Sequence, residues 1–135
     1  MKVRWSIVAL MLLTEQIWAE ESTFPDLSGF TQSTTEHILN RIDSPFQVRA
    51  VEGIIEIEGN SEPLPSVILE IKGPGSERTI RRTQSDRHGR FKIRHVPRGT
   101  YRFKATLNGF QSVIGTIVVS KTNIDRIKLK MLLGV

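Results

Sequence analysis

Ser85, Asp86 and His88 are the residues whose types and spacing come nearest to a chemical site in this chain. A serine nucleophile needs a histidine base, a carboxylate that orients the base and an oxyanion site, and these groups converge from separate parts of a fold. Here the three side chains stand on neighbouring residues of one expected tight turn, pointing outward. We therefore expect Asp86 to stabilise the turn, Ser85 to end a strand and His88 to be solvated. No catalytic residue is predicted, and a small hydrolase is the function class that the sequence favours least.

Metal and cofactor chemistry lack the residues that they require. The three histidines, His37, His88 and His95, do not have metal-ligand spacing, and the chain contains no cysteine. The aspartates are scattered and form no alternating acidic loop for calcium. No glycine-rich loop leads into a Lys-Ser or Lys-Thr pair that would cradle a phosphate. We predict neither a metal nor a cofactor.

Basic residues are concentrated in one part of the chain. Residues 78–104 carry ten lysines and arginines against Asp86 alone, whereas residues 20–77 are predominantly acidic. A hairpin spanning residues 81–94 that presented these cations on one open face would attract anionic partners such as acidic polysaccharides or lipid phosphates. The candidate residues for this anionic-ligand face are Arg81, Arg82, Arg90, Lys92 and Arg94.

The same charges have a second interpretation, which runs of charge generally favour. Acidic strands that lie beside basic ones pair their charges across the ladder, and each such pair contributes a modest stabilisation. Glu56, Glu58 and Glu70 occupy alternate strand positions. We expect them to be solvated rather than to form a carboxylate pair for glycoside hydrolysis. The sequence does not decide whether the basic strands are paired with acidic ones or exposed.

Nucleic acid is a poor candidate for the anionic partner. Proteins that bind single strands stack the bases on exposed aromatic side chains, and the outward positions of the basic strands lack them. Both tryptophans, Trp5 and Trp18, precede the expected mature chain. The same shortage of flat aromatic platforms also weakens a carbohydrate-binding interpretation.

The elements that must position these residues are strands. From Phe46 onward, apolar and polar residues alternate, as they do along half-buried strands. Arg90 and Lys92 alternate with Phe91 and Ile93, and residues 101–107 alternate without exception. Turn clusters rich in Gly, Pro, Asn and Asp recur at regular spacing. About seven short strands follow, which predicts an all-β Greek-key sandwich with a mostly irregular N-terminal arm.

Five short motifs occur in an order that resembles the carboxypeptidase regulatory-like domain. They are Gly53-x-Ile55, Pro63-Leu64-Pro65-x-Val67-x-Leu69, Thr83-x-Ser85-Asp86-x-x-Gly89-x-Phe91, Pro97-x-Gly99-x-Tyr101 and Gly109-Phe110. The resemblance spans roughly Val48 to Leu133 and implies a seven-stranded sandwich of transthyretin-like shape, related to starch-binding domains. The matching residues are turn and core residues, so the resemblance implies an accessory module without a catalytic site. Ser66 departs from the pattern, since the family usually has Gly there, and the turn is expected to differ.

The first residues are typical of an export signal. Lys2 and Arg4 precede a short apolar run that ends in Ala19, where a signal peptidase would cut. The run is too short to span a bilayer, which takes about 20 residues. We predict a signal peptide over residues 1–19, a linker or arm over 20–45 and the sandwich domain over 46–135. Thr35–Ile42 is also compatible with a short helix capped by Ser33 or Thr34.

The sequence thus favours a non-catalytic, exported accessory module that acts by contact with a protein or a glycan at a bacterial envelope. Its partner is an unidentified envelope protein or carbohydrate, in the periplasm or outside the cell, with no nucleic acid and no stable membrane span. A terminal strand over Ile127–Leu133 would add to a partner strand if it lay at a sheet edge. The alternative is a carbohydrate-binding domain that holds an anionic glycan through the basic hairpin.

Overall fold

The computed structural model describes residues 27–34, 38–73 and 79–134, and this part of the chain is all-β. The predicted seven strands beyond residue 45 are present, and an eighth precedes them. No helix of the described residues is long and apolar enough to cross a membrane. The strands are β1 (Leu39–Arg41), β2 (Phe46–Ile57), β3 (Ile68–Lys72), β4 (Ile80–Gln84), β5 (Arg90–Ile93), β6 (Gly99–Thr106), β7 (Ser112–Val119) and β8 (Asp125–Met131).

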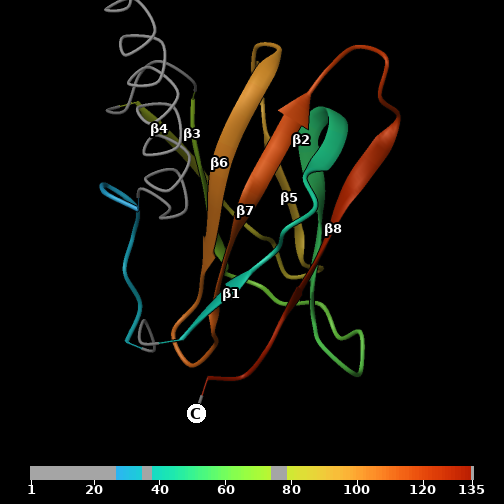
Figure 1. The fold of residues 1–135 in the computed structure, drawn as a ribbon. Coiled ribbons are helices and arrows are strands. Elements are labelled where there is room, and N and C mark those ends of the chain that lie inside the picture. Colours follow the sequence, from blue (N-terminus) through green and yellow to red (C-terminus); the bar gives the residue numbers. More distant parts are fainter. Residues whose placement is uncertain (1–26, 35–37, 74–78, 135) are drawn as a thin grey trace, which may run out of the picture.

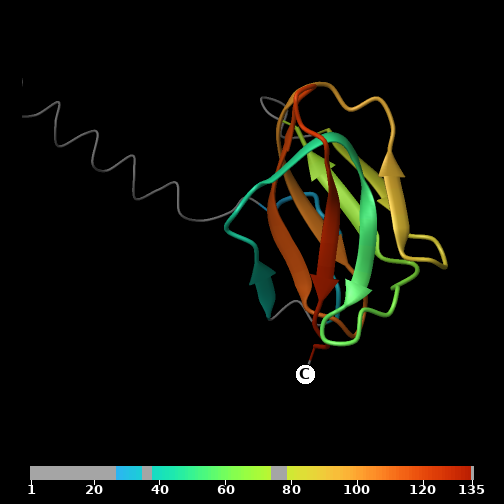
Figure 2. The ribbon, with the colours of Figure 1, turned by 90° about the vertical axis from the view of Figure 1, so that its right-hand side faces the viewer.

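The strands form two layers that share one long strand (Figures 1 and 2). One layer has the order β4-β3-β6-β7, with β1 added to β7, and the other has the order β5-β2-β8. The start of β2 pairs with β7, and its later residues pair with β5 and β8, so β2 passes from one layer into the other. The expected all-β sandwich is confirmed.

Alternation along the strands builds the core between the layers. Phe91 and Ile93 point inward, whereas Arg90 and Lys92 are exposed. Tyr101 is buried and its hydroxyl donates to the Pro97 carbonyl at 2.6 Å, so the ring packs while the oxygen ties down the preceding turn. The largest fully buried apolar side chains are Phe103, Ile55, Leu69, Ile71, Ile117, Ile127, Leu129, Met131, Val48 and Val51.

Gly53 allows β2 and β8 to approach each other closely. A Cβ atom at this position would lie 1.9 Å from the Ile127 carbonyl oxygen, which is backbone and cannot move aside without moving β8. Glycine is therefore required here by contact rather than by its conformational freedom.

The turn from Asp86 to Gly89 has the predicted mechanism, but Ser85 does not point outward. Asp86 Oδ1 accepts from the amides of His88 (2.8 Å) and Arg90 (2.9 Å). Ser85 is buried; its Oγ donates to the Leu64 carbonyl (2.7 Å) and accepts from the Val67 amide (2.9 Å). The expected outward serine is wrong, because this hydroxyl satisfies backbone groups of the loop before β3.

Ser66 keeps a glycine-like turn. Its φ is 65°, in the left-handed region, and its amide donates to the Ser85 carbonyl at 3.0 Å. An L-residue with a side chain is held there at a cost of about 1–2 kcal/mol. The turn therefore keeps the conformation that glycine would adopt, and the departure from the family pattern adds backbone strain at Ser66.

The short helix expected over Thr35–Ile42 is wrong where the structure describes it. Leu39–Arg41 forms β1 and runs parallel to β7, and the Ile42 amide donates to the Ile114 carbonyl at 2.9 Å. A helix this short is marginal by itself, and the edge of β7 offers the backbone a ready set of partners. Residues 35–37, and the signal peptide expected over residues 1–19, lie outside the described residues.

Residues 27–34, called the strap below, cross the outer face of the first layer (Figure 1, blue). Beneath the strap, Glu70 of β3 and Lys104 of β6 are 0% and 1% exposed. The prediction that Glu70 is solvated is therefore wrong: its strand position faces out of the sandwich, but the strap covers it. The same cover buries Lys72, next to it on the outer side of β3.

Candidate functional site

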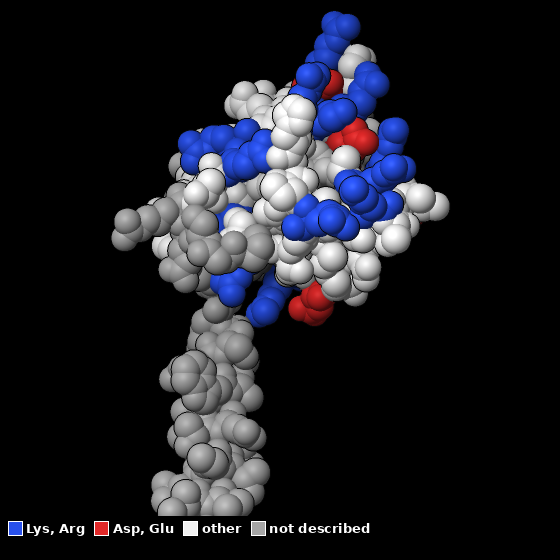
Figure 3. All heavy atoms as spheres, turned by 90° about the horizontal axis from the view of Figure 1, so that it is seen from above, with Lys and Arg blue, Asp and Glu red and all other residues white. Residues whose placement is uncertain are grey.

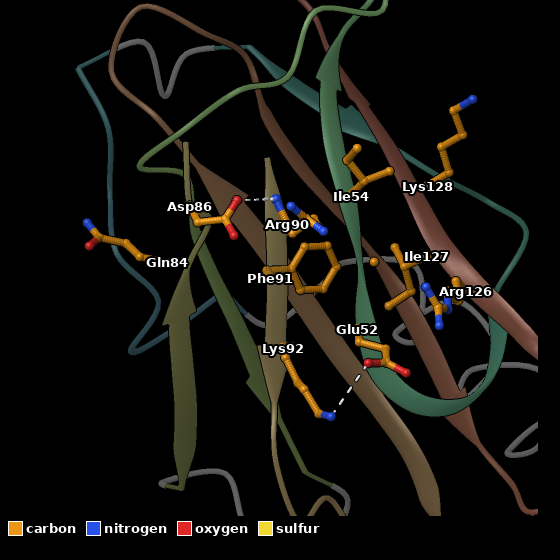
Figure 4. A pocket seen from close by; sticks show the side chains of 11 residues that line it. Glu52, Ile54, Gln84, Asp86, Arg90, Phe91, Lys92, Arg126, Ile127 and Lys128 are labelled. Atoms are coloured by element: carbon orange, nitrogen blue, oxygen red, sulfur yellow. Dashed lines mark hydrogen bonds and ion pairs between the residues drawn. The ribbon is translucent and has the colours of Figure 1, made fainter. Parts of the chain in front are cut away.

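A groove of about 710 Å³ follows the outer face of the layer β5-β2-β8 (Figure 4). Glu52 and Ile54 of β2 form its floor, and Gln84 and Asp86 stand at the end of β4 nearby. Its basic residues come from the two flanking strands: Arg90 and Lys92 from β5, and Arg126 and Lys128 from β8.

The strand register explains why these residues meet. Ile54 lies opposite Arg90 on one side and Lys128 on the other, and Glu52 lies opposite Lys92. Residues separated by two positions share a face, so the outward residues of three strands line one surface. Cations from segments more than thirty residues apart in the chain are thereby placed on the two sides of β2.

The charges in the groove are only partly compensated. Lys92 Nζ lies 3.7 Å from Glu52 Oε2, and Lys128 Nζ lies 3.7 Å from Glu56 Oε1. The amide of Arg90, followed by the amide of His88 and the Arg90 charge, lowers the pKa of Asp86 below its usual range. Arg126 is exposed, and none of the described residues pairs with its guanidinium.

The five predicted ligand residues do not form one face. Arg90 and Lys92 line the groove, but Arg81 and Arg82 belong to β4 in the other layer. Arg82 pairs with Glu70 at 3.0 Å. Arg81 donates to the backbone carbonyls of His95, at 2.8 Å, and Arg94, so its guanidinium holds the loop after β5. Arg94 lies just beyond β5 and is exposed without lining the groove.

Arg126 and Lys128 line the groove but were not among the residues predicted from the sequence. The alternation over residues 125–131 does indicate that their side chains point outward. The sequence contains no signal for the pairing of β8 with β2, which brings them opposite Arg90 and Lys92. The parallel pairing of β8 with the later residues of β2 creates this neighbourhood.

Cross-strand pairing accounts for much of the charge separation along the sequence. Glu70 lies in register with Arg82 on one side and Lys104 on the other. Glu56 lies opposite Lys130 and its carboxylate is 3.0 Å from the Lys130 ammonium. The second interpretation of the basic run is therefore supported for β3 and β2, while the groove retains cations at its flanks.

Lysine and arginine side chains also gather at one end of the sandwich. Seen from above, they form several separate groups with few acidic side chains among them (Figure 3). Uncharged residues separate these groups, so the surface at this end is basic without being one continuous patch. The groove differs from it in having a concave shape.

Among the described residues, Ser85 and His88 are not arranged as a nucleophile and its base. Ser85 Oγ is buried and engaged by backbone groups, and His88 is exposed in the turn. The described residues contain no cluster of three or more His, Cys, Asp or Glu side chains that would hold a metal. An anionic molecule lying along β2 would instead meet cations on both sides.

Comparison with known proteins identifies the family. The sequence pattern of the carboxypeptidase regulatory-like domain matches residues 50–132. Among curated proteins there is no match. Among solved structures, a crystal structure of 3-chlorocatechol 1,2-dioxygenase from Rhodococcus opacus 1CP aligns with a TM-score of 0.41 and 11% identity, over 90% of this chain and 77% of that one. Similarity at this level carries no conclusion about activity. The chain belongs to the carboxypeptidase regulatory-like domain family, a regulatory and non-catalytic type of module.

Proposed function

We propose that this protein is an exported, non-catalytic binding module that holds an acidic glycan in the groove. The observation that carries the proposal is the placement of Arg90 and Lys92 on one side of β2 and of Arg126 and Lys128 on the other. Family membership supports the non-catalytic part.

The composition of the groove favours acidic over neutral sugars. Guanidinium and ammonium groups recognise carboxylate, sulfate or phosphate by charge-assisted hydrogen bonds. The groove is lined by one aromatic residue, Phe91, which is buried in the core, so no exposed flat ring is available for stacking a sugar. Affinity must therefore come from charge and fall as salt rises.

Glycan binding is tested on immobilised heparin and polygalacturonate, with neutral dextran as the negative matrix. The wild-type protein should be retained by both anionic matrices and pass through dextran. The double variant Arg126→Gln/Lys128→Gln should elute at clearly lower salt, and the slope of log affinity against log salt should fall by about one to two because two cations are lost.

A matched double variant separates the groove from general basicity. Arg98→Gln/Lys121→Gln removes the same charges from two exposed residues outside the groove. It should elute near the wild type. Equal losses for the two double variants, or no retention of the wild type, would contradict the proposal.

Protein contact through β8 is the second candidate, and the strand pairing favours it. Among the described residues β8 pairs only with β2, and Met131 directs its carbonyl to the Glu58 amide. By alternation, the backbone groups of Arg126, Lys128 and Lys130 face away from β2 and can accept a partner strand. Lys128→Pro removes one outward amide and should abolish capture of a binding protein from an envelope extract, whereas Lys128→Gln, which loses the same charge but keeps the amide, should not.

Export is the remaining part of the proposal. It rests on the expected signal over residues 1–19, and it predicts that the mature protein begins at Glu20. Mass spectrometry of the protein recovered from a periplasmic or culture fraction tests this, and an intact Met1 in that fraction would contradict it.

A further inference from the structure

The connection between β7 and β8, residues 120–124, is called the tip loop below and ends in an apolar side chain that the protein leaves in water. Ile124 is 86% exposed, whereas the other exposed large apolar side chains of the described residues lie between 37% and 62%. The tip loop is at the top of the molecule in Figure 1, the end that faces the viewer in Figure 3. We propose that this end docks on the surface of an anionic phospholipid membrane, with Ile124 inserted between the lipids and the neighbouring cations on their phosphates.

Hydrogen bonds fix the shape of the tip loop. The Ser120 amide donates to the Val48 carbonyl at 2.9 Å, and the Asn123 amide donates to the Ser120 carbonyl at 3.2 Å. The side-chain amide of Asn123 also donates to the Val48 carbonyl, at 3.4 Å. Ile124 is therefore presented by a turn that is bonded to β2. Inserting a side chain from such a turn costs little conformational entropy, because its backbone is already ordered.

Strand pairing surrounds the tip loop with cations. Gly99 lies opposite Val119, and Val48 lies opposite both Val119 and Asp125, so the start of β6 and the first part of β2 reach the same end of the sandwich. The segments that meet here are residues 48–50, 94–99 and 119–126, and their exposed cations are Arg49, Arg94, Arg98, Lys121 and Arg126. Asp125 is the one acid in these segments, so this end carries a net positive charge.

The combination of an apolar tip and flanking cations favours a lipid surface over the other anionic partners. A glycan offers acidic groups but no apolar interior, so Ile124 would gain nothing from it. An anionic bilayer offers both, because its phosphates attract Lys and Arg and the region beneath them accepts apolar side chains. Each cation near such a surface strengthens binding about fivefold, and the inserted isoleucine adds about tenfold. These contributions describe a reversible, salt-sensitive association.

A polar recess of about 530 Å³ lies beside the tip loop and gives room for a lipid head group. Gln47 at the start of β2 and Asn123 of the tip loop line it, and Arg126 and Asp125 place a cation and a carboxylate on its wall. Arg126 pairs with a phosphate by charge-assisted hydrogen bonds, and Asp125 accepts from a hydroxyl. A phosphoglycerol head group has both of these partners. Arg126 also lines the groove, so the two surfaces meet at this residue.

The test measures binding of the full chain to vesicles of phosphatidylcholine and phosphatidylglycerol in equal parts, by co-sedimentation. Ile124→Ser should weaken binding about tenfold, because the side chain no longer enters the bilayer. Leu133→Ser is the matched control, since Leu133 is 62% exposed beyond the other end of β8. It should bind like the wild type. Residues 1–26 are the same in all three proteins, so they do not contribute to the differences.

Two outcomes of this comparison would overturn the proposal. The first is an Ile124→Ser protein that binds the vesicles as tightly as the wild type. The second is a Leu133→Ser protein that loses as much binding as Ile124→Ser, because the loss would then follow from apolar surface in general. Circular dichroism of both variants verifies that the fold is intact, and both substituted side chains are exposed.

The charge contribution is tested with the double variant Arg98→Gln/Lys121→Gln. It should bind the vesicles more than tenfold more weakly at low salt, since two cations are lost. On heparin the same variant should elute near the wild type, and Ile124→Ser should leave heparin retention unchanged. The groove and the membrane contact can therefore fail separately. A double variant that binds the vesicles like the wild type would overturn the membrane contact and leave the groove in place.

Soluble glycerol phosphate distinguishes a lipid surface from a free phosphate ligand. At matched ionic strength it should not displace the wild-type protein from the vesicles, because it provides no layer for Ile124 to enter. Displacement by glycerol phosphate, with Ile124→Ser and wild type equally sensitive, would overturn the proposal.

Discussion

The two outer faces of the sandwich carry similar alternating charges, but the charged side chains are buried on one face and exposed on the other. On the first layer the strap covers Glu70 and Lys104, which are 0% and 1% exposed. On the other layer Glu52 and Lys92 form an ion pair in an open groove, with side chains 33% and 55% exposed. The residues occupy equivalent outward positions of their strands, so the difference lies in what covers them.

The comparison teaches that an outward strand position does not make a charge solvated. Glu70 is stabilised by Arg82 and by the Thr31 amide, both of which it needs because it is cut off from water. Glu52 has bulk solvent to replace Lys92. The covered face is therefore sensitive to the loss of a single group, and the open face is free to exchange its ion pairs for a ligand.

Removing Glu70 should have the largest effect. Glu70→Ala leaves the Thr31 amide and the Arg82 guanidinium without their carboxylate partner, and the free energy of unfolding should fall by about 3 kcal/mol. Urea unfolding followed by circular dichroism measures this. The matched change on the open face, Glu52→Ala, should cost less than about 1 kcal/mol. Equal losses would mean that the strap does not control the difference between the faces.

On the open face, stability should depend more on the close backbone contact between Gly53 and Ile127 than on the charged side chains. Gly53→Ala places a methyl group against the Ile127 carbonyl and should destabilise the protein by about 2–3 kcal/mol. Gly59→Ala is the control, because a Cβ there meets nothing within 4 Å, although its φ of 102° adds some strain. A Gly53→Ala protein as stable as the wild type would show that β8 moves away easily.

Relieving strain at Ser66, in the connection between the two layers, should have a smaller and opposite effect. Ser66→Gly should stabilise the protein by about 0.5–1 kcal/mol, because the left-handed conformation costs glycine little. Ser44→Gly, at a position without positive φ, should be neutral or destabilising. Thermal unfolding of both variants decides this, and a destabilised Ser66→Gly would contradict the strain.

On the open face, protonation of Glu56 at low pH should lower the stability of the fold. The contact with Lys130, followed by the charges of Lys130 and Lys128, lowers the pKa of Glu56 against the opposing effect of desolvation. A lowered pKa contributes stability that is present above the unfolded-state value, about 4.3, and is lost as pH falls through the folded-state value. The stability difference between wild type and Glu56→Gln should therefore shrink below about pH 4. A constant difference across this range would exclude Glu56 as a contributor.

Local pattern was enough for the strands from β2 to β8 and for their turns, but not for β1, whose residues were expected to be helical. Alternation through Phe91 and Ile93 places both in the core, and Asp86 caps its turn as the residue type indicates. The candidate site was only half predictable. Alternation predicts that Arg90 and Lys92 point outward. Which strands become neighbours decides that these two residues lie near Arg126 and Lys128 and away from Arg81 and Arg82.

By itself, the sequence determined that the chain is all-β, because a period of two and the placement of Gly, Pro and Asp are local patterns that span only a few residues. Tertiary structure alone decided which charges are buried, since the strap reaches Glu70 and Lys104 from 39 and 73 residues away in the chain. It also decided which cations share the groove. Burial and proximity are properties of the whole packing, and no local pattern encodes them.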